Sequence, residues 1–284
     1  MTSATIHAPG TVVEKLVSEK FSLQNRTIHL SLELRERQLL AALLDKHSNQ
    51  YAAWALFPIN EKDSPLKTIL EDELLGHSFS SVSVVTTSNS ALLVPALYFK
   101  KESVKDYLDA QQLSKPDETP CYDYIKSLDS YNLYTVNRTQ DILRKKYPNA
   151  SFRHHSSIFL EYILIENKGS KDDKVYAQVF ANYMDVVVLQ AGKLILSNRF
   201  YFTTSSDFMY YLLWVYEQMG LNTSATPCVF YGEIEKSSEI FKLASNYVKP
   251  ISLGQRNEQS TYSIPLNSLS PHKYRSLFTQ YLCI

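Results

Sequence analysis

Few side chains in this sequence have the type and spacing that chemistry requires. His154 and His155 form the only adjacent pair of imidazoles, and with the nearby carboxylate of Glu161 they have the donor atoms of a metal site. Neighbouring residues of a strand point to opposite faces, so we expect the two rings to face apart and to have a structural or surface role. The sequence therefore predicts no metal site.

The sequence also contains no convincing residues for covalent or acid–base catalysis. Cys121, Cys228 and Cys283 are an odd number and lie far apart, unlike a disulfide framework or a zinc site. No G-x-S-x-G motif is present, and the cysteines are expected to be core or surface thiols. Glu71 and Asp72 fall on a predicted amphipathic helix, where a solvated face is expected. No catalytic residue is predicted.

Composition narrows the function classes. The 29 Lys and Arg residues balance 29 Asp and Glu residues, so no net charge attracts nucleic acid, and we expect no nucleic-acid partner. No apolar run reaches the length of a membrane span, and residues 1–25 lack the apolar core of a secretory signal. We expect a cytoplasmic protein that is not an integral membrane protein. With only 7 glycines, phosphate-cradling loops are hard to build, and no cofactor is predicted.

The first half of the chain predicts a three-stranded meander followed by a helix. Residues 27–34 alternate strictly between apolar and polar, which is typical of a strand buried on one face. The short apolar runs 38–44 and 51–57 favour two further antiparallel strands, although the first also has the propensity of a helix. A Ser-Pro pair at 64–65 suits the start of a helix that ends near Gly76.

The rest of this half is expected to contain strands and helices in turn. Strands are predicted at 81–87, 91–95 and within 122–136, helices at 103–113 and 138–147, and a strand leading into a helix at 152–166. The polar stretch 167–173 contains a glycine and no apolar anchor, so we place the boundary between two halves there.

The second half repeats the order of the first. Residues 174–190 and 193–202 predict the strands of a second meander, with Ala191-Gly192 as a hairpin turn. A helix over 206–220, a strand over 226–234, a helix over 237–248, a strand over 261–266 and a closing helix from 271 follow. The repeat indicates an α/β protein with a duplicated ribonuclease-H-like subdomain and a cleft between the copies. We expect an N-terminal extension without a convincing strand at 1–25, a first subdomain at 26–166 and a second at 174–284.

Four phrases of the sequence resemble the actin-like ATPase superfamily. They are SALLVPALYF (90–99), QAGKLILSNRFYF (190–202), SSDFMYYLLWVYEQMG (205–220) and VFYGEIEKSSEIF (229–241). Within the superfamily the chain is similar to the domain of unknown function 3822 family and to the branch of the pilus protein PilM and the cell-division protein FtsA. The resemblance implies an actin-like ATPase fold. In that superfamily two hairpins with an Asp-x-Gly pattern hold the phosphates and the magnesium ion of ATP.

The chain departs from this pattern where phosphates would bind. Its first hairpin, at 31–38, contains no glycine. In the second hairpin, counting back from Gly192 places Gln178 at the family's aspartate, Phe180 at its glycine and Met184 at its threonine. The resemblance therefore implies a retained fold with the phosphate-binding motifs lost.

The adenosine-side motif of the superfamily survives in part. Its apolar-apolar-x-Gly-Gly pattern corresponds to residues 229–233, where Gly232 is kept and Glu233 replaces the second glycine. We expect these two residues to be a vestigial cofactor-binding site whose carboxylate repels phosphate. The cations Lys193 and Arg199 are expected at or beyond the turn of the second hairpin, away from the nucleotide end.

The helix at 206–220 is unusually rich in aromatic residues. It carries Tyr210, Tyr211, Trp214 and Tyr216, more than one buried stripe uses, because positions 210, 214 and 217 face differently from 208, 212, 215 and 219. The sequence leaves burial of these rings and a partner-binding surface both open.

These observations favour a non-catalytic scaffold or protein-interaction module with an actin-like fold, a degenerate ATPase with a protein partner. A homodimer stays open. The alternative is an actin-like ATPase that binds a nucleotide or another small molecule in a divergent cleft near Gly232.

Overall fold

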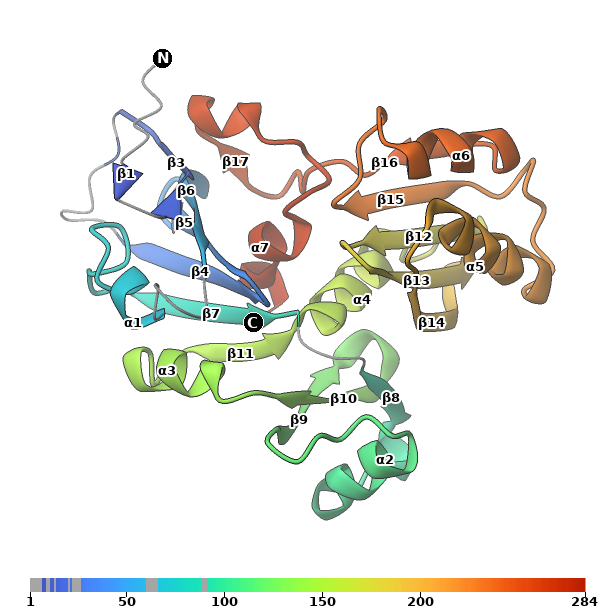
Figure 1. Cartoon of the computed structure of the whole chain (residues 1–284), viewed down its shortest axis with the longest axis horizontal. Helices are drawn as coiled ribbons and strands as arrows, with labels where there is room; N and C mark the ends of the chain where they lie inside the picture. The colour runs from blue at the N-terminus through green and yellow to red at the C-terminus, as the bar shows by residue number, and fades with distance from the viewer. Residues whose placement is uncertain are drawn as a thin grey trace. The chain divides into compact units, whose positions relative to one another are not determined.

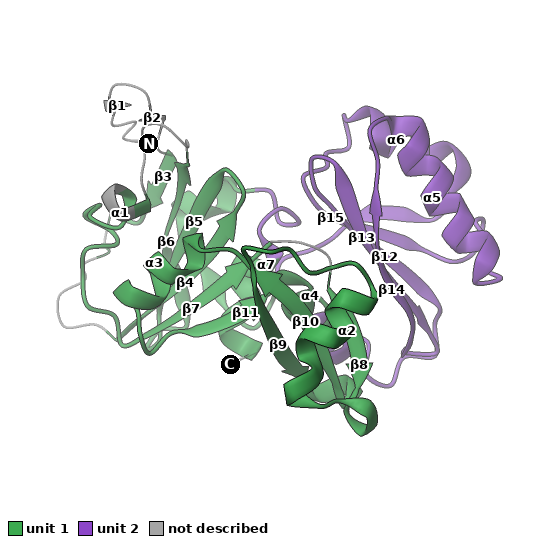
Figure 2. Ribbon diagram, turned by 60° about the horizontal axis from the view of Figure 1, so that its bottom comes forward, with its two compact units in different colours: residues 1–161, 257–269, 276–284 green, residues 162–256, 270–275 purple. Residues whose placement is uncertain are grey.

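The structure is a computed structural model that describes residues 7–8, 11–12, 14–19, 21, 27–59, 66–87 and 91–283. Its residues group into two units (Figure 2). Unit 1 comprises residues 1–161, 257–269 and 276–284, and unit 2 comprises residues 162–256 and 270–275. The stretch 167–173, where we expected the boundary, lies inside unit 2. Most of the chain after residue 256, which we assigned to the second subdomain, groups with unit 1.

Unit 1 is built on a sheet that contains the predicted meander. β4 (Ile28–Arg35), β5 (Gln38–Asp45) and β6 (Gln50–Pro58) are antiparallel neighbours, and β7 (Ser81–Thr86) and β11 (Ser151–His154) lie parallel to β4 on its other side. The order is β11-β7-β4-β5-β6 (Figure 1). The pairings confirm the strands predicted near 27–34, 38–44 and 51–57, and exclude the helical alternative for the second.

Four short strands complete the described N-terminal part and the edge of this sheet. β3 (Glu14–Val17) pairs antiparallel with β6, and β17 (Thr261–Tyr262) pairs parallel with it. β1 (His7–Ala8) and β2 (Thr11–Val12) form a separate pair. The N-terminal extension therefore contains strands that the sequence pattern did not predict.

Strand β4 is buried on both faces, although its alternation predicted burial on one. The apolar face packs in a core with residues of α1 (Leu66–Ile69) and α3 (Thr139–Lys146). The polar residues His29, Ser31 and Glu33 are nevertheless at most 1% exposed. The 3₁₀ helix η5 (Gln280–Cys283) accounts for this, because Gln280 Nε2 donates to the carbonyl of Leu32 across 248 positions of sequence.

His29 is held inside this covered face. Its ring nitrogens lie 2.8 Å from the hydroxyl oxygens of Ser81 and Ser83, and its ring centroid is 4.7 Å from that of Tyr281. Burial, followed by the charge of Lys46, lowers the pKa of His29 to about 4. The imidazole is therefore neutral at physiological pH.

A three-stranded antiparallel sheet is inserted in unit 1 between β7 and α3. Its order is β8 (Leu92–Pro95), β10 (Ser130–Val136), β9 (Thr119–Ile125). α2 (Val104–Ala110) covers one face through a cluster of Val94, Val104, Leu108 and Leu133. These elements confirm the strands predicted at 91–95 and 122–136 and the helix predicted near 103–113.

Unit 2 repeats the strand order of unit 1. β12 (Lys174–Val179), β13 (Tyr183–Gln190) and β14 (Lys193–Tyr201) are antiparallel, and β15 (Cys228–Gly232) and β16 (Ile251–Leu253) lie parallel to β12. The order is β14-β13-β12-β15-β16. In both units three antiparallel strands precede two parallel ones, which is the duplicated ribonuclease-H-like arrangement that the sequence predicted.

Helices α5 (Ser205–Gln218) and α6 (Glu239–Tyr247) contribute to the core of unit 2 on one face of its sheet. Thr204 and Asp207 form a reciprocal capping box at the start of α5, and Gly220 follows its end with a φ of +65°. α4 (His155–Glu166) is the helix through which the chain passes from unit 1 to unit 2. No helix within the described ranges is long and apolar enough to cross a membrane.

Three predicted elements differ from the structure. α1 is only Leu66–Ile69, and turns rather than helix continue to Gly76; residues 64–65 lie outside the described residues. The strand expected at 261–266 is Thr261–Tyr262 alone, because the 3₁₀ helix η4 (Ile264–Ser268) follows, with Pro265 in its first turn. The closing helix, α7 (Arg275–Thr279), begins four residues later than expected.

Acidification is expected to destabilise unit 1 through His29. The pKa is about 4 in the folded protein against 6.5 in the unfolded chain, so the unfolded chain binds the additional proton between these values. The stabilisation is complete above pH 6.5 and is lost as the pH falls toward 4, by roughly 3 kcal/mol.

Denaturant unfolding of the wild type and of His29→Gln at neutral pH and near pH 4 measures this effect. The wild type should lose more free energy of unfolding than the variant, which cannot titrate at this position. Equal losses in the two proteins would contradict the assignment.

Candidate functional site

The turn between β12 and β13 is where the resemblance predicts a phosphate loop. Phe180 N–H donates to the carbonyl of Tyr183 at 2.8 Å, which closes the turn. The two rings stack with centroids 4.5 Å apart and 21° between their planes. Gln178 and Phe180 are 3% and 6% exposed. Packed aromatic rings thus stand where a phosphate loop presents free backbone N–H groups.

Arg199 lies beside this turn, so our expectation that it lies away from the predicted phosphate position was wrong. Its guanidinium is 3.9 Å from the ring centroid of Tyr183. Nε and Nη2 donate to the two carboxylate oxygens of Asp185 at 2.7 and 2.9 Å. The strand register explains the placement, because Arg199 on β14 is directly opposite Asp185 on β13. Lys193 is exposed at the β13–β14 turn, as expected.

The hairpin between β4 and β5 in unit 1 corresponds residue by residue to the hairpin between β12 and β13 in unit 2. Both close on a two-residue turn, so Glu33 corresponds to Gln178 and Arg35 to Phe180. Nε of Arg35 donates to Oε1 of Glu33 at 2.8 Å, and Glu33 is 1% exposed. The position that corresponds to Gln178, where the resemblance implies the family's aspartate, therefore holds in this hairpin a buried carboxylate that is neutralised by its own strand.

Gly232 ends β15 at a point where two strands approach closely. Its φ is +88°, and a Cβ atom there would lie 2.1 Å from the carbonyl oxygen of Val179. Its N–H donates to the carbonyl of His272 at 2.9 Å, and Glu233 N–H donates to Val179 at 2.7 Å. The side chain of Glu233 is exposed. Backbone packing alone accounts for the glycine at this position.

Two cations of unit 2 that lie close to β15 are engaged in ion pairs. Arg275 lies between two tyrosine rings at 3.9 and 4.5 Å, and its Nη2 donates to Glu166 at 3.0 Å. Lys273 Nζ lies 2.7 Å from a carboxylate oxygen of Glu235. Neither is available to a phosphate without breaking an existing pair.

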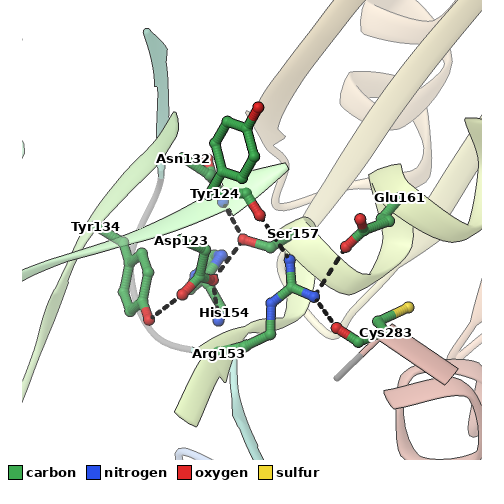
Figure 3. Close-up of polar contacts among 9 residues, drawn as sticks. All are labelled: Asp123, Tyr124, Asn132, Tyr134, Arg153, His154, Ser157, Glu161 and Cys283. Atoms are coloured by element: carbon green, nitrogen blue, oxygen red, sulfur yellow. Dashed lines mark hydrogen bonds and ion pairs between the residues drawn. The ribbon is translucent and has the colours of Figure 1, made fainter. Parts of the chain in front are cut away.

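A buried polar network connects the inserted sheet of unit 1 to the start of α4 (Figure 3). Asp123 on β9 is 6% exposed. Its carboxylate accepts hydrogen bonds from Ser157 Oγ at 2.6 Å, from the N–H of His154 at 2.8 Å and from the hydroxyl of Tyr134 at 2.9 Å. Burial raises the pKa of Asp123, and these donors limit the rise.

Further contacts extend this network to β10 and the C-terminal segment. Asn132 Nδ2 donates to Ser157 Oγ at 2.8 Å. Arg153 Nη1 donates to Glu161 at 2.8 Å and to the carbonyl of Cys283 at 2.5 Å (Figure 3). Because Asp123 and Ser157 are buried and hydrogen-bonded to each other, the arrangement fixes the turn from β11 into α4 and exposes no nucleophile.

The two histidine rings lie side by side, so our expectation that they face apart was wrong. Their centroids are 4.5 Å apart, because His154 ends β11 and His155 begins α4, where strand alternation stops. Nδ1 of His154 is 2.7 Å from Ser156 Oγ, and Nδ1 of His155 is 3.3 Å from the carbonyl of Thr86. Within the described part of the chain, no group of three or more His, Cys, Asp or Glu side chains can hold a metal ion.

The surroundings of the three cysteines and of the pair Glu71 and Asp72 do not favour catalysis. Burial raises the pKa of all three cysteine thiols, that of Cys283 to about 12. Glu71 and Asp72 lie in a turn after α1 rather than on a helix, and Glu71 is exposed. Asp72 pairs with Lys15 Nζ at 2.8 Å. Protonated thiols and a paired carboxylate are poor catalytic groups at neutral pH.

Replacing Gly232 by alanine is expected to destabilise the protein more than replacing Gly220 does. Both glycines have positive φ, but a Cβ at position 220 meets nothing within 4 Å. Gly220→Ala therefore reports the backbone strain alone, roughly 1 kcal/mol, and Gly232→Ala adds a clash, for a total above roughly 3 kcal/mol. Denaturant unfolding compares the variants. Equal losses would show that residue 232 has room and would remove the structural explanation for its glycine.

Removing the carboxylate of Asp123 is expected to cost about 3 kcal/mol of unfolding free energy, because three donors would lose their buried acceptor. Asp109→Ala is the matched control, since this carboxylate of the same inserted region is exposed and pairs with Lys105. Chemical denaturation of Asp123→Ala and Asp109→Ala measures the difference. A loss below about 1 kcal/mol for both would contradict a structural role for the network.

The sequence matches the family described as protein of unknown function (DUF3822) over residues 18–251. No curated protein is detectably similar to it in sequence.

Two solved structures are similar to this chain in fold over most of its length. A Bacteroides thetaiotaomicron VPI-5482 protein with an actin-like ATPase fold and unknown function is 18% identical, with 86% of this chain and 95% of that chain covered and a TM-score of 0.72. A chain of the PilM-PilN type IV pilus biogenesis complex is 10% identical, with 90% and 98% covered and a TM-score of 0.56. At these identities the likeness concerns the fold and not the activity. This chain belongs to the DUF3822 family and has the actin-like ATPase fold.

Proposed function

We propose that this protein is a non-catalytic scaffold that binds another protein and does not use the hairpins of its fold to hold ATP. The observation that carries the proposal is the filling of both hairpin turns by the chain's own side chains. Phe180 and Tyr183 stack in one, and Glu33 pairs with Arg35 in the other.

Phosphate binding at these turns would require costly rearrangement. The N–H of Phe180 is already bonded to Tyr183, so it is not free to contact an anion. Moving Arg35 toward a phosphate would leave the buried carboxylate of Glu33 without its counter-ion, at a cost of several kcal/mol. The pairing of Arg199 with Asp185 imposes the same kind of cost in unit 2.

Exposed aromatic side chains support binding of a protein. Tyr98, Tyr201, Tyr210 and Trp214 are 66%, 55%, 64% and 40% exposed. Tyrosine and tryptophan are enriched at protein interfaces, where their rings contribute large apolar area together with a polar group. The similar pilus-biogenesis chain was solved in a complex with another protein, which agrees with a binding role for this fold. A homodimer is one form that such binding could take.

Magnesium ATP is expected to cause no saturable rise in the melting temperature and no measurable hydrolysis. A nucleotide at about 100 times its dissociation constant would add roughly 2.7 kcal/mol, which raises the melting temperature by several degrees. Differential scanning fluorimetry over a millimolar range of ATP, with a phosphate-release assay, provides the measurement.

Glu233→Gln is the informative second variant, because it removes an exposed carboxylate next to Gly232 while keeping the backbone hydrogen bonds of this turn. It should remain as insensitive to ATP as the wild type. A saturable shift in the wild type that grows in Glu233→Gln would favour the alternative function, a nucleotide site near Gly232.

A further inference from the structure

Two aromatic residues of α5 face solvent along one line. Tyr210 and Trp214, four residues apart, are 64% and 40% exposed. Tyr216 is 1% exposed and donates its hydroxyl to the carbonyl of Thr226. Tyr211 is half-buried, with its ring 5.3 Å from that of Tyr210. We call Tyr210, Tyr211 and Trp214 the aromatic ridge.

The ridge lies over an open sheet edge. The ring of Phe200 on β14 is 5.3 Å from that of Tyr211 and 6.0 Å from that of Trp214. β14 is the terminal strand of its sheet, so among the described residues no strand pairs with its outer side. Its pairing with β13 is regular from Leu196 to Tyr201. A strand added there would direct alternate side chains to the α5 side.

Carboxylates flank the ridge at both ends. Asp207 and Glu217 are the only charged residues of α5. Hydrogen bonds from Thr203 and Thr204 lower the pKa of Asp207, so it is ionised at neutral pH. Glu239 of α6 accepts a hydrogen bond from Ser205 at the start of α5.

Neither cation of β14 neutralises these carboxylates. Arg199 is paired with Asp185, and its side chain is 7% exposed. Lys193 is at the far end of β14, at the turn into β13. The surface that α5 and β14 form beside Tyr210 and Trp214 is therefore aromatic and acidic, which favours a cationic ligand.

We infer that the aromatic ridge and the outer edge of β14 form a docking site for an extended, arginine- or lysine-bearing segment of a partner protein. The segment adds to β14 as a strand through backbone hydrogen bonds. Its alternate side chains lie on the α5 side, where a guanidinium or ammonium group packs on Trp214 or Tyr210. This inference rests on the proposed scaffold function and specifies the chemistry of its partner.

A displayed library of random dodecapeptides, selected on the purified full chain, tests the inference. The wild type should enrich peptides with Lys or Arg at alternate positions and without internal proline. A Tyr210→Ser/Trp214→Ser double variant should lose this enrichment. Tyr247→Ser is the matched control, because Tyr247 of α6 is 55% exposed and lies outside the ridge. Circular dichroism and melting curves verify that the variants fold.

A selected peptide is then titrated while tryptophan fluorescence is recorded. The chain has two tryptophans, and Trp54 is 2% exposed, so a saturable change reports on Trp214. We expect at least a tenfold loss of affinity in Tyr210→Ser, weaker binding at higher salt, and loss of binding when a proline replaces a central residue of the peptide.

Several results would overturn the inference. The wild type could enrich no peptides, the double variant could enrich the same peptides, or the enriched peptides could be acidic. A wild-type dimer that dissociates in the double variant would also overturn it, because it would identify a second copy as the occupant. None of these readouts involves a nucleotide. Failure of the docking inference is therefore distinguishable from binding or hydrolysis of ATP, which would contradict the proposed function itself.

Discussion

Burial of the central strands on both faces is the constraint on which the polar contacts of this protein depend. A polar side chain on such a strand has no solvent to face and must be paired in the interior. His29 is held between two serine hydroxyls, Glu33 is paired with Arg35, and Asp185 is paired with Arg199. The side chains of these sheets that could take part in catalysis or ligand binding are therefore bonded to partners inside the protein.

The same constraint supports our proposal that an actin-like ATPase fold persists here without phosphate loops. The fold needs two hairpins of fixed register, and the register is maintained by buried pairs across and along the strands. Glycine is needed at a hairpin where φ is positive, as at Gly192, or where an anion approaches the backbone. Where no anion binds, aromatic stacking at Phe180 or an ion pair at Arg35 stabilises the turn directly.

Local patterns predicted the strands and the repeat, but not what covers them. Alternation in β4 predicted its period correctly, yet its polar face is buried by residues near 280, and sequence pattern carries no information on such distant contacts. His154 and His155 were misplaced because the turn from β11 into α4 falls between them. Arg199 was misplaced because only strand register brings it opposite Asp185. The Asp123 network had no sequence signal, since its members come from four separate segments of unit 1.

Equilibrium dialysis of the full chain against radiolabelled ATP with magnesium tests the central claim most directly, because it measures binding without requiring turnover or a change in stability. The account predicts that bound ATP rises only in proportion to free ATP, with no saturation up to millimolar concentration. Saturation at about one ATP per chain would contradict it, since binding of that kind requires a phosphate site that the filled hairpins do not offer.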